Sequence, residues 1–341
     1  MVMPQHKVYK GIHYVSDKKL KWKREKQGTG FRFLDNDDNR LTDQEITRIR
    51  GLSIPPAWIN VQICPDEKGH IQAIGYDSKD RKQYIYHPQW ILYNQENKFD
   101  SMVQFGEVLP TLREEVAANM RQHKLTKDRV LATIVWLLEH TFIRIGNKVY
   151  EKDNKSYGLT TLREKHVEVD GNKIKFSFKG KSGVHHHHDI KHPRVVQTIK
   201  QCIELPGYKV FHYFDEDDNL QVVDSKDVNE YLQKVTGEAL SAKDFRTWGG
   251  TTLAGDTLSN LGSFSEEITL KDAFSHTVDE VSSHLGNTPG VCRKYYIHPK
   301  IFSSYEKNKL VAHFEEIYKN YRQKPGKLSP SERAVWTLIQ K

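Results

Sequence analysis

The sequence has few cysteines and no long apolar run. Cys64, Cys202 and Cys292 are three widely spaced cysteines in 341 residues. An odd number at such spacing argues against a disulfide framework and favours a reducing compartment. No segment approaches the run of about 18 apolar residues that a transmembrane helix requires. The opening residues MVMPQHKVYKG also lack the apolar stretch of a secretory signal. We therefore expect a cytoplasmic protein with no membrane partner.

Several motifs of nucleotide and metal chemistry are incomplete. Gly180-Lys181-Ser182 resembles the end of a phosphate-binding loop, but Lys175 occupies the position of its first glycine. Gly28-Thr29-Gly30 lacks the third glycine of a dinucleotide fingerprint, because Phe33 stands there. The chain has no Cys-x-x-Cys and no His-Glu-x-x-His. Neighbours on one strand point to opposite faces, so we interpret His185–His188 as a polar loop after a hairpin. We expect no metal site and no cofactor.

The charge balance is basic. Lys and Arg total 52 and Asp and Glu total 44, which gives a formal net charge of +8 at pH 7. The segment Lys18–Lys26 holds six of these cations around Trp22. Cations of this kind neutralise phosphates and release counterions, and an aromatic ring can stack on a base or sugar. Taken alone, the stretch fits a solvated loop equally well.

The first ninety residues have the pattern of short strands and turns. Thr42-Asp43-Gln44-Glu45 has the spacing of a capping box, which predicts a short helix that ends at Gly51. A strand is predicted around Phe31 and Phe33, a hairpin from 61–64 and 70–75, and a further strand at 84–86. We interpret residues 1–92 as a small β-rich domain.

The period becomes helical from about residue 93. Apolar residues from Val130 to Ile145 recur at helical spacing, and Gly146 supplies a stop. Residues 167–178 have the pattern of a hairpin around Asp170-Gly171-Asn172. Further helices are predicted at 195–203, 227–235, 242–258 and 270–285, the last followed by Gly286. We interpret residues 93–341 as a larger, mainly helical domain with an inserted hairpin, which makes the chain an α+β protein.

Four separate stretches carry residues suited to phosphoryl transfer. Taken singly each is weak, because a helix-end arginine usually serves a carboxylate and a tyrosine is usually a packed aromatic. The stretches are Phe142–Asn147 with Arg144 at a helix end, Phe178–Gly183 with Lys181 at a hairpin end, Lys243–Trp248 with Arg246 near a helix start, and Asn287–Pro299 with Tyr295 and Tyr296 beside cations.

The order and spacing of these stretches resemble the bacterial, poxvirus-like type IB DNA topoisomerases. The separations from Arg144 to Lys181 and from Asn287 to Tyr296 match the family pattern. So do Tyr157–Leu162 and the motif Gly75-x-Asp77-x-x-x-Arg81-x-Gln83-Tyr84-x-Tyr86. The resemblance implies a two-domain clamp around double-stranded DNA, in which residues 1–92 are a DNA-binding domain and residues 93–341 are the catalytic domain. It implies a monomer associated with the nucleoid. It also implies relaxation of supercoils through a 3′-phosphotyrosyl intermediate, strand rotation and religation, without ATP or metal.

The resemblance also assigns roles within the site. Tyr296 is the nucleophile, because the family's Tyr-Ile-x-Pro ending selects it over Tyr295. Two arginines, Arg144 and Arg246, suit the non-bridging oxygens of a pentacoordinate phosphate because they make bidentate, permanently charged contacts. Lys181 suits the departing 5′ oxygen as its general acid. Asn287 stands where poxvirus members carry histidine, and it can donate only a neutral hydrogen bond.

Five further residues match family positions that contact DNA. They are Arg81, Gln83, Tyr84, Tyr86 and Tyr150. The amide of Gln83 can bond adenine in the major groove, and Arg81 suits guanine or phosphate. Two tyrosines spaced by two lie on one strand face and would also suit a core, but their flanking residues are charged.

Two other functions remain open at this point. A tyrosine site-specific recombinase shares the arginine, lysine and tyrosine chemistry. It more often has a helical front domain and His-x-x-Arg at the second arginine, where this chain has Lys243-Asp244-Phe245-Arg246. A DNA-binding protein with a vestigial site is disfavoured, because every expected functional group is present.

Overall fold

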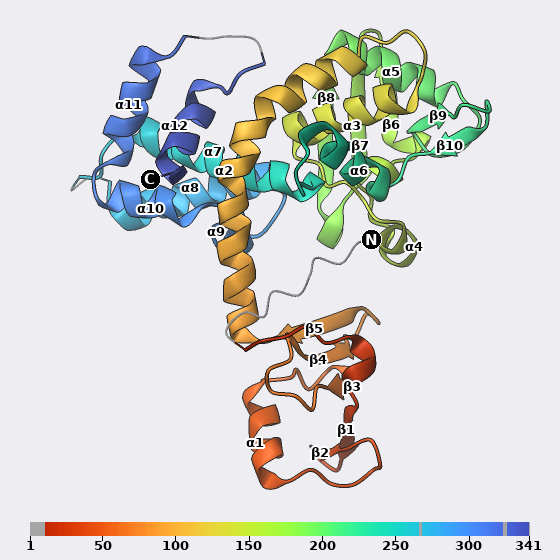
Figure 1. Ribbon diagram of the computed structural model, residues 1–341, viewed down its shortest axis with the longest axis vertical. Coiled ribbons are helices and arrows are strands. Elements are labelled where there is room, and N and C mark those ends of the chain that lie inside the picture. The colour runs from red at the N-terminus through yellow and green to blue at the C-terminus, as the bar shows by residue number, and fades with distance from the viewer. Residues whose placement is uncertain (1–10, 266–267, 323–325, 341) are drawn as a thin grey trace. The chain divides into compact units, whose positions relative to one another are not determined.

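The computed structural model describes residues 11–265, 268–322 and 326–340. The chain forms two compact units, Met1–Lys98 and Phe99–Lys341 (Figure 1). The division falls inside helix α2 (Pro88–Asn119), a few residues after the boundary at residue 92 that the change of period suggests. The β-rich first unit and the mainly helical second unit make this an α+β protein, as predicted.

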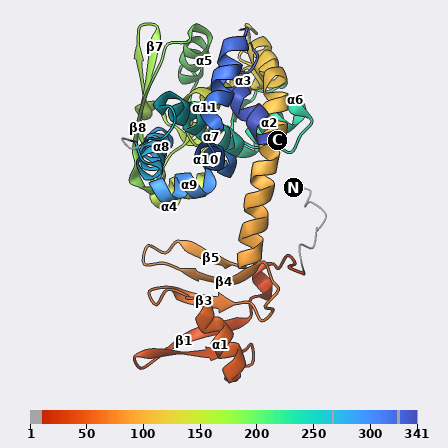
Figure 2. The same ribbon diagram turned by 90° about the vertical axis from the view of Figure 1, so that its left-hand side faces the viewer.

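The first unit is built on a five-stranded antiparallel sheet. Its strands are β1 (Trp22–Gln27), β2 (Gly30–Leu34), β3 (Ile59–Ile63), β4 (Ile71–Tyr76) and β5 (Lys82–Tyr86), in the order β2-β1-β3-β4-β5 (Figure 2). Helix α1 (Asp43–Gly51) packs Ile46 and Ile49 into the same core as Val61 and Ile63. The Thr42 capping box and the β3–β4 hairpin are both confirmed.

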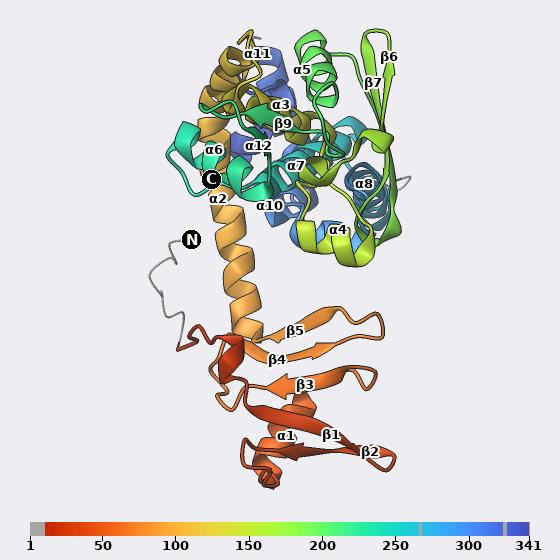
Figure 3. The ribbon, with the colours of Figure 1, turned by 90° about the vertical axis from the view of Figure 1, so that its right-hand side faces the viewer.

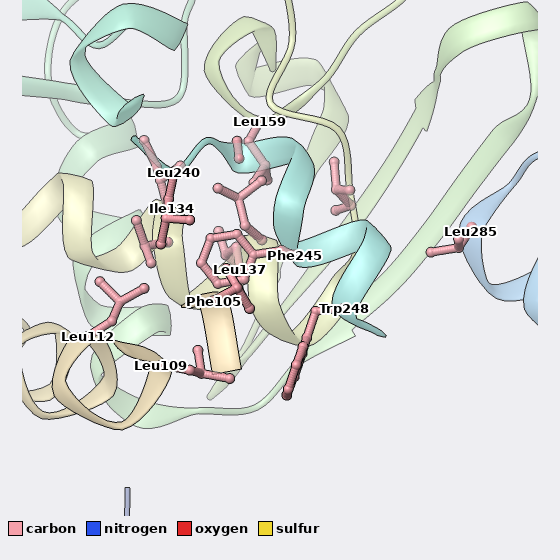
Figure 4. Packing of buried hydrophobic residues seen from close by; sticks show 14 of the residues in the cluster. Phe105, Leu109, Leu112, Ile134, Leu137, Leu159, Leu240, Phe245, Trp248 and Leu285 are labelled. Atoms are coloured by element: carbon pink, nitrogen blue, oxygen red, sulfur yellow. The ribbon is translucent and has the colours of Figure 1, made fainter. Parts of the chain in front are cut away.

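The second unit is organised around two helices, α3 (Lys127–Thr141) and α7 (Ala242–Leu261). Figure 4 shows Ile134 and Leu137 of α3 in one apolar cluster with Phe105 of α2 and Phe245 of α7. The rings of Phe105 and Phe245 meet edge to face with centroids 5.1 Å apart, an arrangement that aromatic pairs favour. This buried framework fixes α7, which carries Arg246.

The remaining helices surround this centre. Helix α8 has the bounds that its apolar spacing predicts, and Gly286 ends it at φ 56°. No described helix is long and apolar enough to cross a membrane. The helices are α4 (Lys148–Asn154), α5 (Pro193–Ile203), α6 (Ser225–Thr236), α8 (Leu270–Leu285), α9 (Pro289–Tyr295), α10 (Pro299–Glu306), α11 (Leu310–Asn320) and α12 (Pro330–Gln340).

The predicted hairpin is part of a three-stranded sheet. Strands β6 (Val167–Asp170), β7 (Lys173–Lys179) and β8 (His185–Ile190) pair in that order, and α5 lies beside β7 (Figure 3). The interpretation of His185–His188 as a loop is wrong, because these residues form most of β8. Pairing with β7 and ring stacking on Phe178 stabilise a strand that the local sequence does not favour.

Helix α3 is shorter than its apolar period predicts. It ends at Thr141, and Phe142 takes a left-handed conformation with φ 52°. Ile145 therefore lies outside the helix. Residues 142–147 run without regular structure, and contacts with α7 described below hold this segment. A small hairpin of β9 (His212–Phe214) and β10 (Leu220–Val222) completes the unit.

Candidate active site

The segment that carries Arg144 is held by the chain that follows α4. The carbonyl of Arg144 accepts a hydrogen bond from the backbone of Leu159 at 2.9 Å, and the carbonyl of Ile145 accepts one from the backbone of Thr160 at 2.8 Å. A methyl group on Gly158 would lie 2.4 Å from the Arg144 carbonyl oxygen, so only glycine fits there. The Tyr-Gly-Leu-Thr-Thr-Leu motif thus positions the first arginine.

Helix α7 carries the second arginine and packs closely against the segment that follows α3. Arg246 is 3% exposed, and its guanidinium donates to the carbonyl of Phe142 and, at 2.6 Å, to the carbonyl of Leu285. A methyl group on Gly249 would lie 2.1 Å from the Phe142 ring. The sequence Gly249-Gly250 therefore lets the segment after α3 pack directly against α7.

Tyr296 is fixed through its backbone. It follows α9, and its carbonyl accepts a hydrogen bond from the Thr251 hydroxyl at 3.2 Å. The same hydroxyl accepts from the backbone of His298 at 3.0 Å. A methyl group on Gly250 would lie 2.8 Å from the Tyr296 carbonyl oxygen. The half-buried Tyr296 ring lies under the Arg246 guanidinium, 5.2 Å from its carbon to the ring centroid.

These elements enclose a pocket of about 300 Å³. Four of the five residues predicted as catalytic line it, namely Arg144, Lys181, Arg246 and Tyr296, and the exposed Tyr150 of α4 lines it too. Tyr295 lies in the last turn of α9 with its ring 5.3 Å from the Lys294 ammonium. The structure therefore brings together, in one unit, stretches that are widely separated in the sequence.

Asn287 joins the site through Arg144. The guanidinium of Arg144 donates a hydrogen bond to Oδ1 of Asn287. Within the described part of the chain, Nδ2 of Asn287 and Nε of Arg246 are buried and have no hydrogen-bond partner. A buried donor without an acceptor costs about 1–3 kcal/mol, and a ligand that accepts from it would remove that cost. Both donors suit an anionic oxygen.

The electrostatics of the site also fit an anion. Burial, together with the charge of Arg246 nearby, lowers the pKa of Arg144 to about 10, and burial lowers the pKa of Arg246. Both guanidiniums stay charged at neutral pH, and no carboxylate contacts either of them among the hydrogen bonds and ion pairs of the described residues. Two close, unneutralised cations repel each other, and a bound phosphate would remove that repulsion.

Lys181 enters the pocket from the turn between β7 and β8. Its side chain is exposed, and the turn closes with a backbone hydrogen bond of 2.7 Å from Gly180 to Val184. Ser182 and Gly183 both have positive φ, at 62° and 82°. The tight turn therefore presents the lysine at the end of the sheet.

Across the described residues, no cluster of three or more His, Cys, Asp or Glu side chains could hold a metal ion. The inward-facing members of the histidine run, His186 and His188, stack on each other with centroids 5.9 Å apart and contribute packing.

A carboxylate that sequence reasoning missed anchors α4. Glu151 is buried and accepts hydrogen bonds from Arg163 at 3.0 and 3.1 Å and from Lys209. Burial disfavours its charged form, but Lys209 and Arg163 outweigh this effect and hold the pKa of Glu151 below its ordinary value. These contacts fix the helix that presents Tyr150. The sequence signal for this role of Glu151 is its position in the first turn of a short helix.

The predicted DNA-contacting residues of the first unit lie around β5. Asp77 accepts hydrogen bonds from Nε of Arg81 at 2.8 Å and from Nε2 of Gln83 at 2.9 Å. Tyr84 and Tyr86 are 40% and 38% exposed, and their rings stack with centroids 5.8 Å apart. The two tyrosines therefore lie on the surface of the unit, on the other face of β5 from Gln83.

Two arginines, a lysine and a tyrosine thus line one cavity, and the amide of Asn287 is bonded to one of the arginines. This set of groups is suited to transferring a phosphodiester to a phenol. Comparisons with known proteins agree with this chemistry. Residues 81–324 match the family model for the catalytic core of eukaryotic DNA topoisomerase I, and residues 30–77 match that for the N-terminal domain of bacterial DNA topoisomerase IB.

Two relatives extend the match. The chain is 32% identical over 320 residues to DNA topoisomerase 1B of Acanthamoeba polyphaga mimivirus, which covers 88% of this chain and 95% of the relative. It is 24% identical over 226 residues to DNA topoisomerase 1B of vaccinia virus, covering 66% of this chain and 69% of the relative. The chain is an enzyme, and it belongs to the type IB DNA topoisomerases.

Proposed function

We propose that this enzyme relaxes supercoiled duplex DNA by transient cleavage of one strand, with Tyr296 as the nucleophile. The observation that carries the proposal is the convergence of Tyr296, Arg144, Arg246 and Lys181 on one pocket, with Asn287 bonded to Arg144. All five groups come from one chain, which supports action as a monomer. From the family resemblance we also propose that the enzyme acts in the cytoplasm, associated with the nucleoid.

The cleavage step exchanges one ester bond for another. The phenol oxygen of Tyr296 attacks the scissile phosphorus while its proton passes to solvent. The bond from phosphorus to the 5′ oxygen breaks, and Lys181 gives a proton to that oxygen, which leaves as a hydroxyl. The product is a 3′-phosphotyrosyl bond and a free 5′ hydroxyl end. The 5′ end rotates before it attacks the phosphotyrosine and restores the strand.

The remaining groups stabilise the charge that builds on the phosphate. Arg144 and Arg246 contact the two non-bridging oxygens, and Nδ2 of Asn287 donates to one of them. The partnerless nitrogens of Asn287 and Arg246 support this role, because both are buried donors. Each diester is replaced by another diester of similar free energy, so religation requires no ATP. The guanidinium pair supplies the positive charge that a metal ion would otherwise provide.

The test uses negatively supercoiled plasmid in EDTA without ATP. We expect relaxed topoisomers, and a covalent DNA adduct that mass spectrometry maps to Tyr296. Tyr296→Phe should abolish cleavage while duplex affinity stays within a few-fold, because only the nucleophilic hydroxyl is removed. Tyr295→Phe is the matched control and should keep relaxing DNA. An adduct on Tyr295, or recombination between sites instead of relaxation, would contradict the proposal.

A further inference from the structure

The histidine run of β8 places one ring next to the catalytic turn. Alternate residues of the strand face inward, so His186 and His188 are half-buried while His185 and His187 are exposed. His186 pairs in register with Phe178 of β7, and their rings stack with centroids 5.2 Å apart. Within β8, His186 is the inward-facing residue nearest to the turn that carries Lys181.

Two glycines leave room for this ring. A methyl group on Gly180 would lie 2.6 Å from Cδ2 and 2.7 Å from Nε2 of His186. A methyl group on Gly286 would lie 2.9 Å from Cε1 of the same ring. Gly180 directly precedes Lys181, and Gly286 directly precedes Asn287. The imidazole therefore lies between the backbones of two catalytic segments.

The ring is uncharged in this position. Burial, with the neighbouring His188 and the cations Arg144 and Arg246, lowers the pKa of His186 to about 4. A neutral imidazole adds no further positive charge to the arginine pair. It acts as a flat surface of fixed size, filling the space between the turn and the end of α8.

The turn that carries Lys181 has few anchors of its own. Its three residues, Lys181 to Gly183, are exposed, and backbone hydrogen bonds within the turn close it. These bonds set the shape of the turn but do not set its place relative to Asn287. His186 spans the gap between the turn and that segment, with Gly180 on one side and Gly286 on the other. Val184, at the end of the turn, also approaches Gly286, with Cγ1 3.4 Å from a methyl group placed there.

We propose that His186 is a positioning residue for Lys181, holding the β7–β8 turn against the Gly286–Asn287 segment so that the ammonium reaches the leaving oxygen. This inference rests on the proposed function, in which Lys181 is the general acid. A displacement of about 1 Å in a reacting group can cost roughly 10²-fold in rate. Loss of the ring should therefore affect the proton transfer first.

The experiment compares two cleavage substrates in single-turnover reactions. One is an ordinary duplex, and the other has sulfur as the bridging 5′ atom at the scissile phosphate. A thiolate leaves without protonation, so a defect in the acid disappears on the sulfur substrate. Lys181→Ala is the reference, and we expect it to be roughly 10²–10⁴-fold slow on the ordinary duplex and nearly restored on the sulfur duplex.

Removal of the ring should reproduce that signature. We expect His186→Ala to be roughly 10²-fold slow on the ordinary duplex and within a few-fold of wild type on the sulfur duplex. Adding His186→Ala to Lys181→Ala should produce no further loss. His186→Phe keeps a flat ring and should recover most of the rate. His187→Ala, on the outward face, is the matched control and should match wild type.

Other outcomes distinguish a failure of the acid role of Lys181 from a failure of the positioning role of His186. If sulfur fails to restore Lys181→Ala, the acid role in the proposed function is wrong. If sulfur restores Lys181→Ala but leaves His186→Ala equally slow on both substrates, the positioning role is wrong. A His186→Ala rate equal to wild type on the ordinary duplex also overturns it. Melting temperatures and duplex affinities of all variants identify any that fail to fold. If His186→Ala does, His186→Val, which suits a strand but lacks the ring, replaces it on both substrates with the same expected result.

Discussion

Arg144 and Asn287 lie 143 residues apart in the sequence and are joined by a hydrogen bond from the guanidinium to Oδ1 of the amide. This bond settles the orientation of the amide group. Because Oδ1 accepts from Arg144, Nδ2 must point elsewhere, and it is buried with no partner within the described residues. Arg144 therefore orients Asn287 so that its Nδ2 group can donate a hydrogen bond. Because the asparagine side chain is neutral, it contributes a donor without a positive charge.

Two replacements of Asn287 distinguish the role of its Nδ2 donor from that of its Oδ1 acceptor. Asn287→Ala removes the Nδ2 donor, and we expect cleavage to slow by roughly 10²-fold, as for other single donors to a developing oxyanion. Asn287→Asp keeps the acceptor for Arg144 but sets a negative charge against the phosphate, so its rate should be lower still. Asn219→Ala, in the exposed β9–β10 turn, is the control for single-turnover cleavage. An Asn287→Asp rate near that of wild type would remove the donor role.

Arg144→Lys should make cleavage dependent on pH. Burial and the charge of Arg246 lower the pKa of Arg144 to about 10, so arginine stays charged across the working range. Lysine has an ordinary pKa near 10.4, and the same surroundings would lower it further. Since the charged form is lost as pH rises, the rate of Arg144→Lys relative to wild type should fall between pH 6 and pH 9.

The measurement is single-turnover cleavage at constant ionic strength across that range. Arg163→Lys is a matched control, because Arg163 bonds Glu151 and its pKa is raised by that hydrogen bond. Its rate relative to wild type should not change with pH. A constant ratio for Arg144→Lys would mean that its surroundings do not disfavour a charged lysine.

Asp77 orients two predicted DNA-reading side chains in the first unit. Its carboxylate accepts from Arg81 and from Gln83, and the hydrogen bond from Arg81 holds the pKa of Asp77 well below its ordinary value. Asp77→Asn would free both side chains and remove one negative charge beside these predicted DNA contacts. We expect affinity for random duplex to stay level or rise, while preference among duplex sequences weakens.

Competition binding at one salt concentration measures that preference. Asp66→Asn in the β3–β4 turn removes an equal charge from the same unit without contacting Arg81 or Gln83, and it controls for net charge. If Asp77→Asn lowers affinity for all duplexes by the same factor, Asp77 acts on general binding and not on base readout.

Local signals were sufficient for many elements of the fold. Helix α8 follows its apolar spacing from Leu270 to Leu285, and the Thr42 capping box starts α1, because both depend on residues within a few positions. Strand β8 was missed because histidine has little strand preference and its stability comes from pairing with β7. Helix α3 was predicted too long because Ile145 fits its period, whereas contacts from α7 pull the chain away at Phe142.

The residue types of the site could be predicted, but their contacts could not. The order of Arg144, Lys181, Arg246 and Tyr296 carried the family resemblance, and the pocket brings all four together. Nothing local indicated that Arg144 bonds Asn287 or that Thr251 holds the backbone of Tyr296. Such contacts depend on packing between helices that are distant in the sequence, and no residue spacing within one stretch reports them.

The Gly249-Gly250 pair offers the last prediction, which separates the position of the nucleophile from the stability of the fold. A methyl group on Gly250 would lie 2.8 Å from the Tyr296 carbonyl oxygen and 3.3 Å from its Cβ. Gly250→Ala must therefore displace Tyr296, although alanine itself favours a helix over glycine by about 1 kcal/mol. We expect slower cleavage, by roughly tenfold or more, with little change in melting temperature.

Gly255→Ala on the same helix is the matched control for this variant. Its methyl group would lie 2.6 Å from Cζ of the buried Phe314 ring, away from Tyr296. Overpacking of this kind costs about 1–3 kcal/mol, so we expect a lower melting temperature and an unchanged cleavage rate in the folded enzyme. Gly250→Ala should thus change the cleavage rate, whereas Gly255→Ala should change the melting temperature. If Gly250→Ala lowers stability and leaves the cleavage rate intact, the close approach of α7 to Tyr296 serves packing and does not position the nucleophile.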